Sequence, residues 1–162
     1  MSTEEPPPPK TLGPYRIVKQ IGQGGMGIVY EAVHEGISRR VAIKLLRSEY
    51  AHNSQVAQRF FNEARAANLI EHPALVQISE FGQLPDGSTY LVMELLKGEN
   101  LAKRLRRSGA QPLPWVLRIG CQLAEALGAA HRKGIVHREP SPVENCGWVF
   151  PRHREAAEAN ST

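Results

Sequence analysis

The alternation of apolar and polar residues predicts strands over several segments of the chain. Five segments are rich in β-branched and aromatic residues: 15–21, 28–33, 40–46, 75–84 and 89–94. Short stretches of turn residues separate neighbours, and Pro85-Asp86-Gly87-Ser88 favours a hairpin turn between the last two. The pattern therefore predicts a five-stranded antiparallel sheet.

Helical spacing of apolar residues occurs in three places. Residues 54–70 repeat apolar residues at intervals of three and four, which predicts one long helix. A short helix around Leu101 and Leu105 is expected next. A longer helix is expected from Pro114 to Lys133, with an apolar face made by Val116, Ile119, Leu123, Leu127 and Ala130. A sheet with one long helix packed on it, followed by further helices, is an α+β fold.

A glycine cluster lies between the first two predicted strands, in Ile21-Gly22-Gln23-Gly24-Gly25-Met26-Gly27-Ile28-Val29. Dinucleotide-binding domains share this glycine spacing, but there the glycines open a helix, whereas a strand follows here. A P-loop is excluded because no Gly-Lys-Ser/Thr follows. The cluster predicts a hairpin turn where backbone amides approach phosphates closely, and a plain glycine-rich surface turn is the alternative.

A lysine and a glutamate extend this candidate site. Side chains two apart on a strand share a face, so Ala42 and Lys44 point the same way. With Val29 on that face, the small Ala42 leaves room for a flat base while Lys44 reaches the phosphates. Glu63 lies within the apolar face of the long helix, where a carboxylate is costly to bury unless it meets a cation, and Lys44 is the expected partner. The alternatives are a structural lysine at a strand end and a Glu63 side chain that reaches water beside Arg59.

From Tyr15 to Arg138 the chain resembles a bacterial, eukaryotic-like serine/threonine protein kinase. The resemblance rests on the glycine loop, on Val41-Ala42-Ile43-Lys44, on the helix glutamate and on Ile135-Val136-His137-Arg138. It implies a protein kinase-like N-lobe followed by the helical start of a C-lobe. It also implies ATP-dependent phosphorylation of serine or threonine in proteins, with ATP and Mg as cofactors and with Lys44 and Glu63 in catalytic roles.

The resemblance further implies which residues contact the nucleotide. Met93 would guard the back of the base pocket, and the connector through Gly98 would hydrogen-bond adenine through its backbone. The implied nucleotide-binding residues are Ile21, Gly22, Gln23, Gly24, Gly25, Met26, Gly27, Val29, Ala42, Lys44, Met93, Glu94 and Leu96.

The resemblance breaks within the catalytic loop. The family motif is H-R-D-L-x-x-x-N, whereas this chain has His137-Arg138-Glu139-Pro140-Ser141-Pro142-Val143-Glu144-Asn145. Glu139 occupies the base position, and its extra methylene displaces the carboxylate by roughly an ångström, which can cost about a hundredfold in rate. Asn145 comes one residue too late for the metal-binding asparagine, so the metal ligands stay unknown. Neither Asp-Phe-Gly nor Ala-Pro-Glu follows.

These departures predict a truncated or frame-shifted copy that binds ATP weakly at most and transfers little or no phosphate. The alternatives are an active kinase completed by a partner chain, a pseudokinase-type nucleotide-binding or scaffolding module, and a non-functional fragment. The expected organisation is a disordered Pro-rich leader over 1–13, a kinase N-lobe and hinge over 14–98, a partial C-lobe over 99–146 and a non-homologous tail over 147–162.

Composition narrows the classes of partner. The 162 residues include 20 basic and 16 acidic side chains, and the basic clusters lack interleaved aromatics, which favours a solvated face over nucleic-acid binding. Cys121 and Cys146 show no metal-ligand spacing, and Cys121 is expected to act as a small hydrophobe within a helix. No apolar run has the length of a membrane span, so a cytoplasmic protein with an unidentified protein substrate or partner is expected.

Overall fold

The computed structural model describes residues 9–25, 27–50, 53–70 and 72–135, with only the backbone of Ser48, Ser54, Glu63 and Ala66. The chain forms two compact units. The first comprises Met1–Ala64 and Gln77–Leu95, and the second comprises Arg65–Val76 and Leu96–Thr162.

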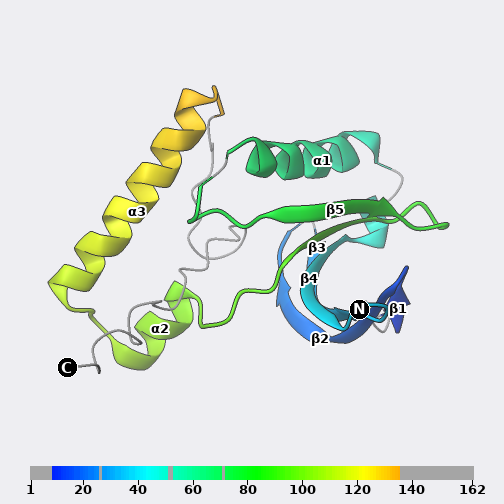
Figure 1. Cartoon of the computed structure of the whole chain (residues 1–162), viewed down its shortest axis with the longest axis horizontal. Coiled ribbons are helices and arrows are strands. Elements are labelled where there is room, and N and C mark those ends of the chain that lie inside the picture. The colour runs from blue at the N-terminus through cyan, green and yellow to red at the C-terminus, as the bar shows by residue number, and fades with distance from the viewer. Residues whose placement is uncertain (1–8, 26, 51–52, 71, 136–162) are drawn as a thin grey trace, which may run out of the picture. The chain divides into compact units, whose positions relative to one another are not determined.

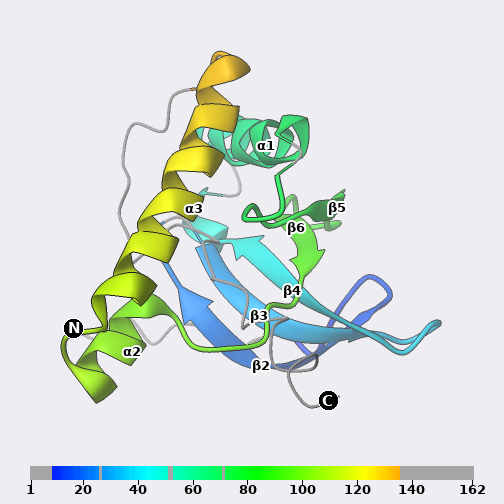
Figure 2. The ribbon, with the colours of Figure 1, turned by 60° about the vertical axis from the view of Figure 1, so that its left-hand side comes forward.

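The first unit is built on a single sheet. Within the described residues it has six strands in the order β1-β2-β3-β4-β6-β5, and each strand pairs antiparallel with its neighbours (Figure 2). The strands are β1 Thr11–Leu12, β2 Tyr15–Gln23, β3 Gly27–His34, β4 Arg39–Leu46, β5 Ile78–Gln83 and β6 Thr89–Glu94. The five expected strands correspond to β2 to β6, and β5 is shorter than expected because it begins at Ile78.

Strand β1 corrects the expectation of an unpacked leader over residues 1–13 and of a five-stranded sheet. Thr11 and Leu12 pair with Arg16 and Tyr15 of β2, and Leu12 is completely buried. A two-residue strand is too short to show alternation, and the proline run before it dominates the local composition. Residues 1–8 lie outside the described residues.

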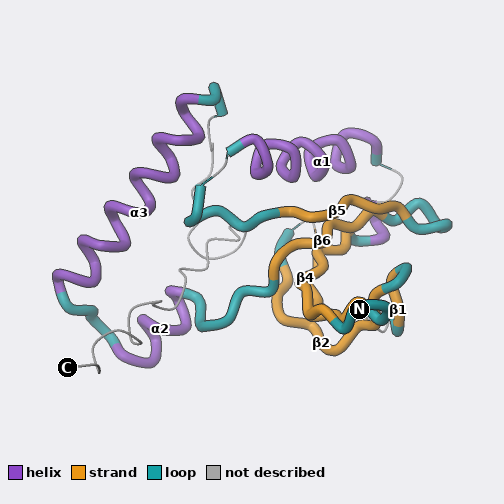
Figure 3. Tube along the Cα trace, viewed as in Figure 1, coloured by secondary structure: helices purple, strands orange, loops and turns teal. Residues whose placement is uncertain are grey.

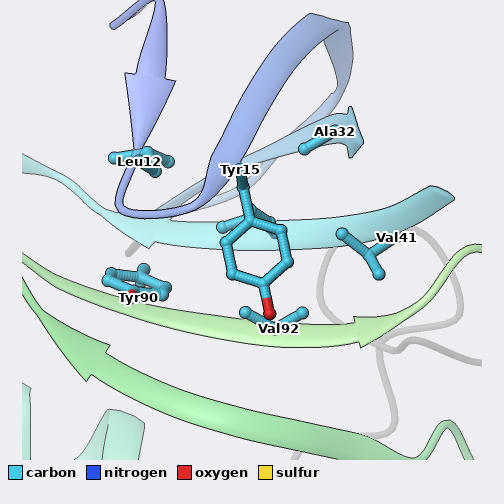
Figure 4. Packing of buried hydrophobic residues seen from close by; sticks show 7 residues of the cluster. Leu12, Tyr15, Ala32, Val41, Tyr90 and Val92 are labelled. Carbon is cyan, nitrogen blue, oxygen red and sulfur yellow. The ribbon is translucent and has the colours of Figure 1, made fainter. Parts of the chain in front are cut away.

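One face of the sheet holds an apolar cluster formed by Leu12, Tyr15, Ala32, Val41, Ile43, Tyr90 and Val92 (Figure 4). Tyr15 lies on β2 and Val92 on β6, which are not neighbours in the sheet, so the sheet curls around the cluster. The Tyr15 hydroxyl donates to Glu80 Oε2 at 2.5 Å, and the Tyr90 hydroxyl donates to Glu80 Oε1 at 3.4 Å. Both bonds tie interior strands to the edge strand β5.

The opposite face of the sheet is covered by helix α1, Ser54–Leu69 (Figure 1). Its cluster comprises Leu46, Phe60, Ala64 and Leu91. The two faces alternate along β6, because Leu91 packs beneath α1 while Tyr90 and Val92 join the first cluster. The Asn53 side chain caps α1, since its Oδ1 accepts hydrogen bonds from the backbone amides of Gln55 and Val56.

The second unit contains helices α2, Leu101–Ser108, and α3, Leu113–Arg132 (Figure 3). Asn100 caps α2 by accepting from the Lys103 amide at 2.8 Å. Arg104 stacks 4.6 Å from the ring centroid of Trp115 and donates from Nε to Gln111 at 2.8 Å. This contact ties α2 to the first turns of α3.

Helix α3 begins and ends within two residues of the positions that the sequence predicts. Pro114 lies in its first turn, and Gly134 follows its end with a φ of 72°, as expected for these residue types. Cys121 differs from expectation, because it is exposed rather than packed as a small hydrophobe. Helical periodicity alone does not say which apolar positions of a helix meet a neighbour.

Candidate nucleotide-binding site

The glycine cluster forms the hairpin between β2 and β3, where the Gly24 amide donates to the Gly27 carbonyl at 2.9 Å. A Cβ on Gly27 would lie 2.7 Å from the Leu45 carbonyl oxygen, so packing itself requires glycine there. A Cβ on Gly22 would make only ordinary contacts with Val29, and one on Gly25 would meet nothing within 4 Å. The fold therefore does not account for glycine at Gly22 and Gly25. Met26 lies outside the described residues.

The strand register gathers the expected base-contacting and phosphate-contacting residues on one face. Lys44 on β4 lies opposite Val29 on β3, and Ala42 lies opposite Met93 on β6. Directly opposed residues of antiparallel strands share a face, and so do residues two apart along a strand. Val29, Ala42, Lys44 and Met93 therefore share the face that α1 covers further along.

The ammonium group of Lys44 lies over the ring of Phe60 on α1, 5.3 Å from the ring centroid. Phe60 is completely buried, so the ring is a fixed support for the lysine stem and head. Sequence reasoning placed Phe60 only on the apolar stripe of the helix. Glu63 lies on α1 three residues after Phe60, and its side chain is outside the described atoms, so its ion pair with Lys44 remains a prediction.

A buried carboxylate on the same face was not expected from the sequence. Glu31 on β3 lies opposite Ala42 and is 5% exposed. Its side chain forms ion pairs with Lys19 of β2, at 3.7 Å, and with Arg40 of β4. The sequence did carry a signal for this cluster, because Lys19, Glu31 and Arg40 place opposite charges on neighbouring predicted strands. The cluster joins three strands next to the position of Ala42.

The end of β6 and the connector after it contribute less to the described site. Met93 is half-buried and packs against the cluster beneath α1. Glu94 is exposed, and its backbone amide and carboxylate both bond to the backbone of Gln77. Leu96 belongs to the second unit. Glu139 and Asn145 lie outside the described residues, and the part of the chain that the structure describes has no cluster of three metal-ligating side chains.

Most of the chain matches one known family. The protein kinase domain family matches residues 15–140. The chain belongs to this family. In kinase terms, the first unit holds the sheet of the N-lobe and α1 up to Ala64, and α2 and α3 belong to the helical part that follows. The glycine cluster lies at the β2–β3 hairpin, and Val41-Ala42-Ile43-Lys44 lies within β4.

Several relatives are named as serine/threonine kinases. The chain is 40% identical over 134 residues to the serine/threonine-protein kinase PknA of Mycobacterium tuberculosis, covering 80% of this chain and 31% of PknA. It is 38% identical over 143 residues to the probable serine/threonine-protein kinase pknA2 of Bifidobacterium longum, covering 86% of this chain and 19% of the relative.

Solved kinase structures agree with the fold. The crystal structure of the Mycobacterium tuberculosis PknI kinase domain matches with a TM-score of 0.66 and 29% identity. The match covers 82% of this chain and 54% of the PknI chain. The chain thus spans about half of that kinase domain and less than a third of the curated relatives.

None of the described helices is both long enough and apolar enough to cross a membrane.

Proposed function

We propose that these 162 residues bind an adenine nucleotide weakly and do not by themselves transfer its phosphate. The observation that carries the proposal is the register of β3, β4 and β6, which brings Val29, Ala42 and Lys44 to one face. This face adjoins the glycine hairpin, where Gly25 has open space in place of a side chain. Open space over exposed backbone is what a phosphate group needs in order to reach amide donors.

The residues present fit ATP better than they fit its metal. Ala42 is small enough to leave room for a base beside Val29, and Lys44 supplies a positive charge two residues further along the same face. Bound ATP would supply a transferable phosphoryl group, and Mg would neutralise its charge. Among the residues expected to hold Mg, only Asn145 is present, one position out of register, and Asp-Phe-Gly is absent from these residues. We therefore expect a dissociation constant above about 100 μM, which corresponds to roughly 5.5 kcal/mol.

The absence of phosphate transfer follows from the catalytic loop. Phosphoryl transfer depends almost entirely on positioning and on neutralising charge. Glu139 in place of aspartate shifts the base carboxylate by roughly an ångström. With the metal aspartate also absent from this chain, both requirements fail together.

Nucleotide binding is tested by calorimetric titration of the full chain with Mg-ATP and with ATP alone. We expect weak binding that Lys44→Met reduces further and that Gly25→Val abolishes without lowering the melting temperature. Lys10→Met, which changes an exposed lysine away from the hairpin, is the matched control and should bind like the unmodified chain. A low-micromolar constant would contradict the predicted weakness and favour a pseudokinase that senses nucleotide.

Phosphate transfer is tested with labelled ATP, using the chain itself and a generic basic protein as acceptors. We expect no incorporation above the level of Lys44→Met. Incorporation that Lys44→Met removes would overturn the proposal and show that Glu139 serves as the base. Restoring aspartate with Glu139→Asp is not expected to rescue transfer, because the metal aspartate remains absent.

A further inference from the structure

Strand β2 pairs with β3 through two register shifts. The first shift falls between Ile17 and Lys19, and the second falls between Gln20 and Gly22. Each shift adds to β2 one residue that has no partner on β3, and the second of these residues is Ile21. The segment between the shifts is held by two strand pairs, so backbone pairing alone specifies its register weakly.

The first shift decides which face of the sheet Lys19 occupies. Ile17 packs against the apolar cluster around Tyr15, and in a regular strand Lys19, two residues later, would point into the same cluster. The extra residue turns Lys19 to the opposite face, where it lies across from Glu31. An ammonium group is costly to bury among apolar side chains, whereas on this face it meets a carboxylate. The charges therefore favour the shifted register.

Glu31 binds one cation from each neighbouring strand. Its side chain is 6% exposed, its Oε2 lies 3.7 Å from Lys19 Nζ, and its Oε1 contacts Arg40 Nη2. The side chains of Lys19 and Arg40 are 64% and 63% exposed, so either can be replaced without opening the core. Desolvating a carboxylate is costly unless cations meet it, and this cost keeps Lys19 in its place between the two shifts.

Ile21 is the residue that this segment places at the candidate site. Side chains alternate along a strand, so Ile21 shares the face of Lys19, which is also the face of Val29 and Ala42. Ile21 is 44% exposed, which leaves its apolar side chain free to cover a flat base beside Val29. A slip of the segment by one residue would turn Ile21 to the other face.

We propose that Glu31 is a positioning residue for the nucleotide base. Through its ion pair with Lys19, it fixes the register of β2 and holds Ile21 over the base. The inference rests on the proposed nucleotide site and adds to it a residue that acts on the base through its neighbours. Arg40 binds the same carboxylate but lies on β4, whose described pairs with β3 and β6 run without a register shift. The ion pair of Arg40 is therefore not needed to place Ile21.

Hydrogen exchange of the full chain without nucleotide tests the ion pair itself. Lys19→Met should speed exchange of the backbone amides from Lys19 to Gly22 at least about tenfold, and change those of β4 and β6 by less than about twofold. Arg40→Met is the matched control, because it removes an equally exposed cation from the same carboxylate, and it should leave the β2 amides unchanged. Glu31→Gln should act like Lys19→Met. Uniform acceleration over the whole sheet, or equal effects of the two methionine variants, overturns the proposal.

Titration with Mg-ATP tests the link to the base. The amide shifts of the glycine hairpin, followed by NMR up to about 20 mM ATP, cover the weak binding that is expected. Lys19→Met should raise the dissociation constant about threefold to tenfold, and the conservative Lys19→Arg should leave it within about twofold. In an Ile21→Ala background, Lys19→Met should change the constant by less than about twofold, because its effect runs through Ile21.

The outcomes separate this proposal from the proposed function. Equal weakening by Lys19→Met in the presence and in the absence of the Ile21 side chain overturns the positioning role. Failure of the unmodified chain to bind ATP overturns the proposed function instead, and exchange in the free chain still decides whether Glu31 holds β2 in register.

Discussion

Two tyrosines share one carboxylate in the first unit, and this contact makes stability sensitive to alkaline pH. Burial of the Tyr15 ring, and then its hydrogen bond to Glu80, raise the pKa of Tyr15 to about 12 from the ordinary 10.0. Burial and the charge of the same carboxylate also raise the pKa of Tyr90. In both cases the neutral phenol is the form that the folded chain prefers.

Tyr15→Phe should lower the free energy of unfolding at neutral pH by about 1–2 kcal/mol, because it removes a hydrogen bond to a carboxylate. Above pH 10.0 the unfolded chain loses the Tyr15 proton before the folded chain does, so this contribution declines between pH 10.0 and about 12. Urea unfolding of both proteins at several pH values measures this contribution to the free energy of unfolding. The gap between the original chain and Tyr15→Phe should narrow over that interval, and a constant gap would contradict the assignment.

The glycine hairpin offers a matched pair of substitutions. Gly27→Ala should cost about 1–3 kcal/mol of stability, since its Cβ would lie 2.7 Å from the Leu45 carbonyl oxygen. Gly25→Ala should change stability by less than about 0.5 kcal/mol, because its Cβ meets no atom within 4 Å. Thermal and urea unfolding of both variants compares them directly. Equal losses would mean that the hairpin is not held as described.

At the scale of the elements, β1 is the part of the fold that depends most on one side chain. Leu12→Ala should lower the free energy of unfolding by about 2–5 kcal/mol, because Leu12 is completely buried in the cluster around Tyr15. Val18→Ala on β2, where the side chain is 44% exposed, should cost less than about 1 kcal/mol. A loss at Leu12 no larger than at Val18 would show that β1 does not belong to the core.

Helix α1 shows how an element positions the candidate site. Phe60 and Ala64 fix the helix to the sheet through Leu46 and Leu91, and the same Phe60 ring lies under the Lys44 ammonium. The Phe60 side chain therefore both packs α1 against the sheet and supports the lysine of the candidate site. The position of Lys44 is therefore coupled to the seating of α1 on the sheet.

At the scale of the whole molecule, the two units differ in how their apolar residues are covered. The sheet of the first unit has an apolar cluster on each face. In the described part of the second unit, α3 buries only two alanines, whereas Leu113, Val116 and Leu117 are exposed. Each large side chain left in water forgoes about 1.5–3 kcal/mol of burial.

The exposed side chains of Leu113, Val116 and Leu117 on α3 should bind a hydrophobic-surface dye. We expect the dye fluorescence to be weaker for Leu117→Glu than for the unmodified chain, because the substitution places a charge among these side chains. Ile37→Glu, which changes a residue of the β3–β4 turn that is 67% exposed, is the control and should match the unmodified chain. Dye binding that Leu117→Glu leaves unchanged would place the dye on another surface.

The sequence alone determined the features that depend on local chemistry. Alternation predicted β2 to β6, helical spacing with Pro114 and Gly134 delimited α3, and the glycine cluster together with Lys44 identified the family. These features are local because strand and helix periodicity, turn residues and motif spacing are all read within short windows.

Tertiary structure decided what depends on residues far apart in the chain. Leu12 became a core residue because the sheet curls so that β2 lies near β6 and β5, and Phe60 came to lie beneath Lys44 because α1 packs across that face. Glu31 is buried because Lys19 and Arg40 lie over it from neighbouring strands. Cys121 and Leu117 lie on the exposed side of α3, although periodicity places them in an apolar helix. Burial is a property of neighbours in space, and no local pattern fixes which neighbours a side chain will meet.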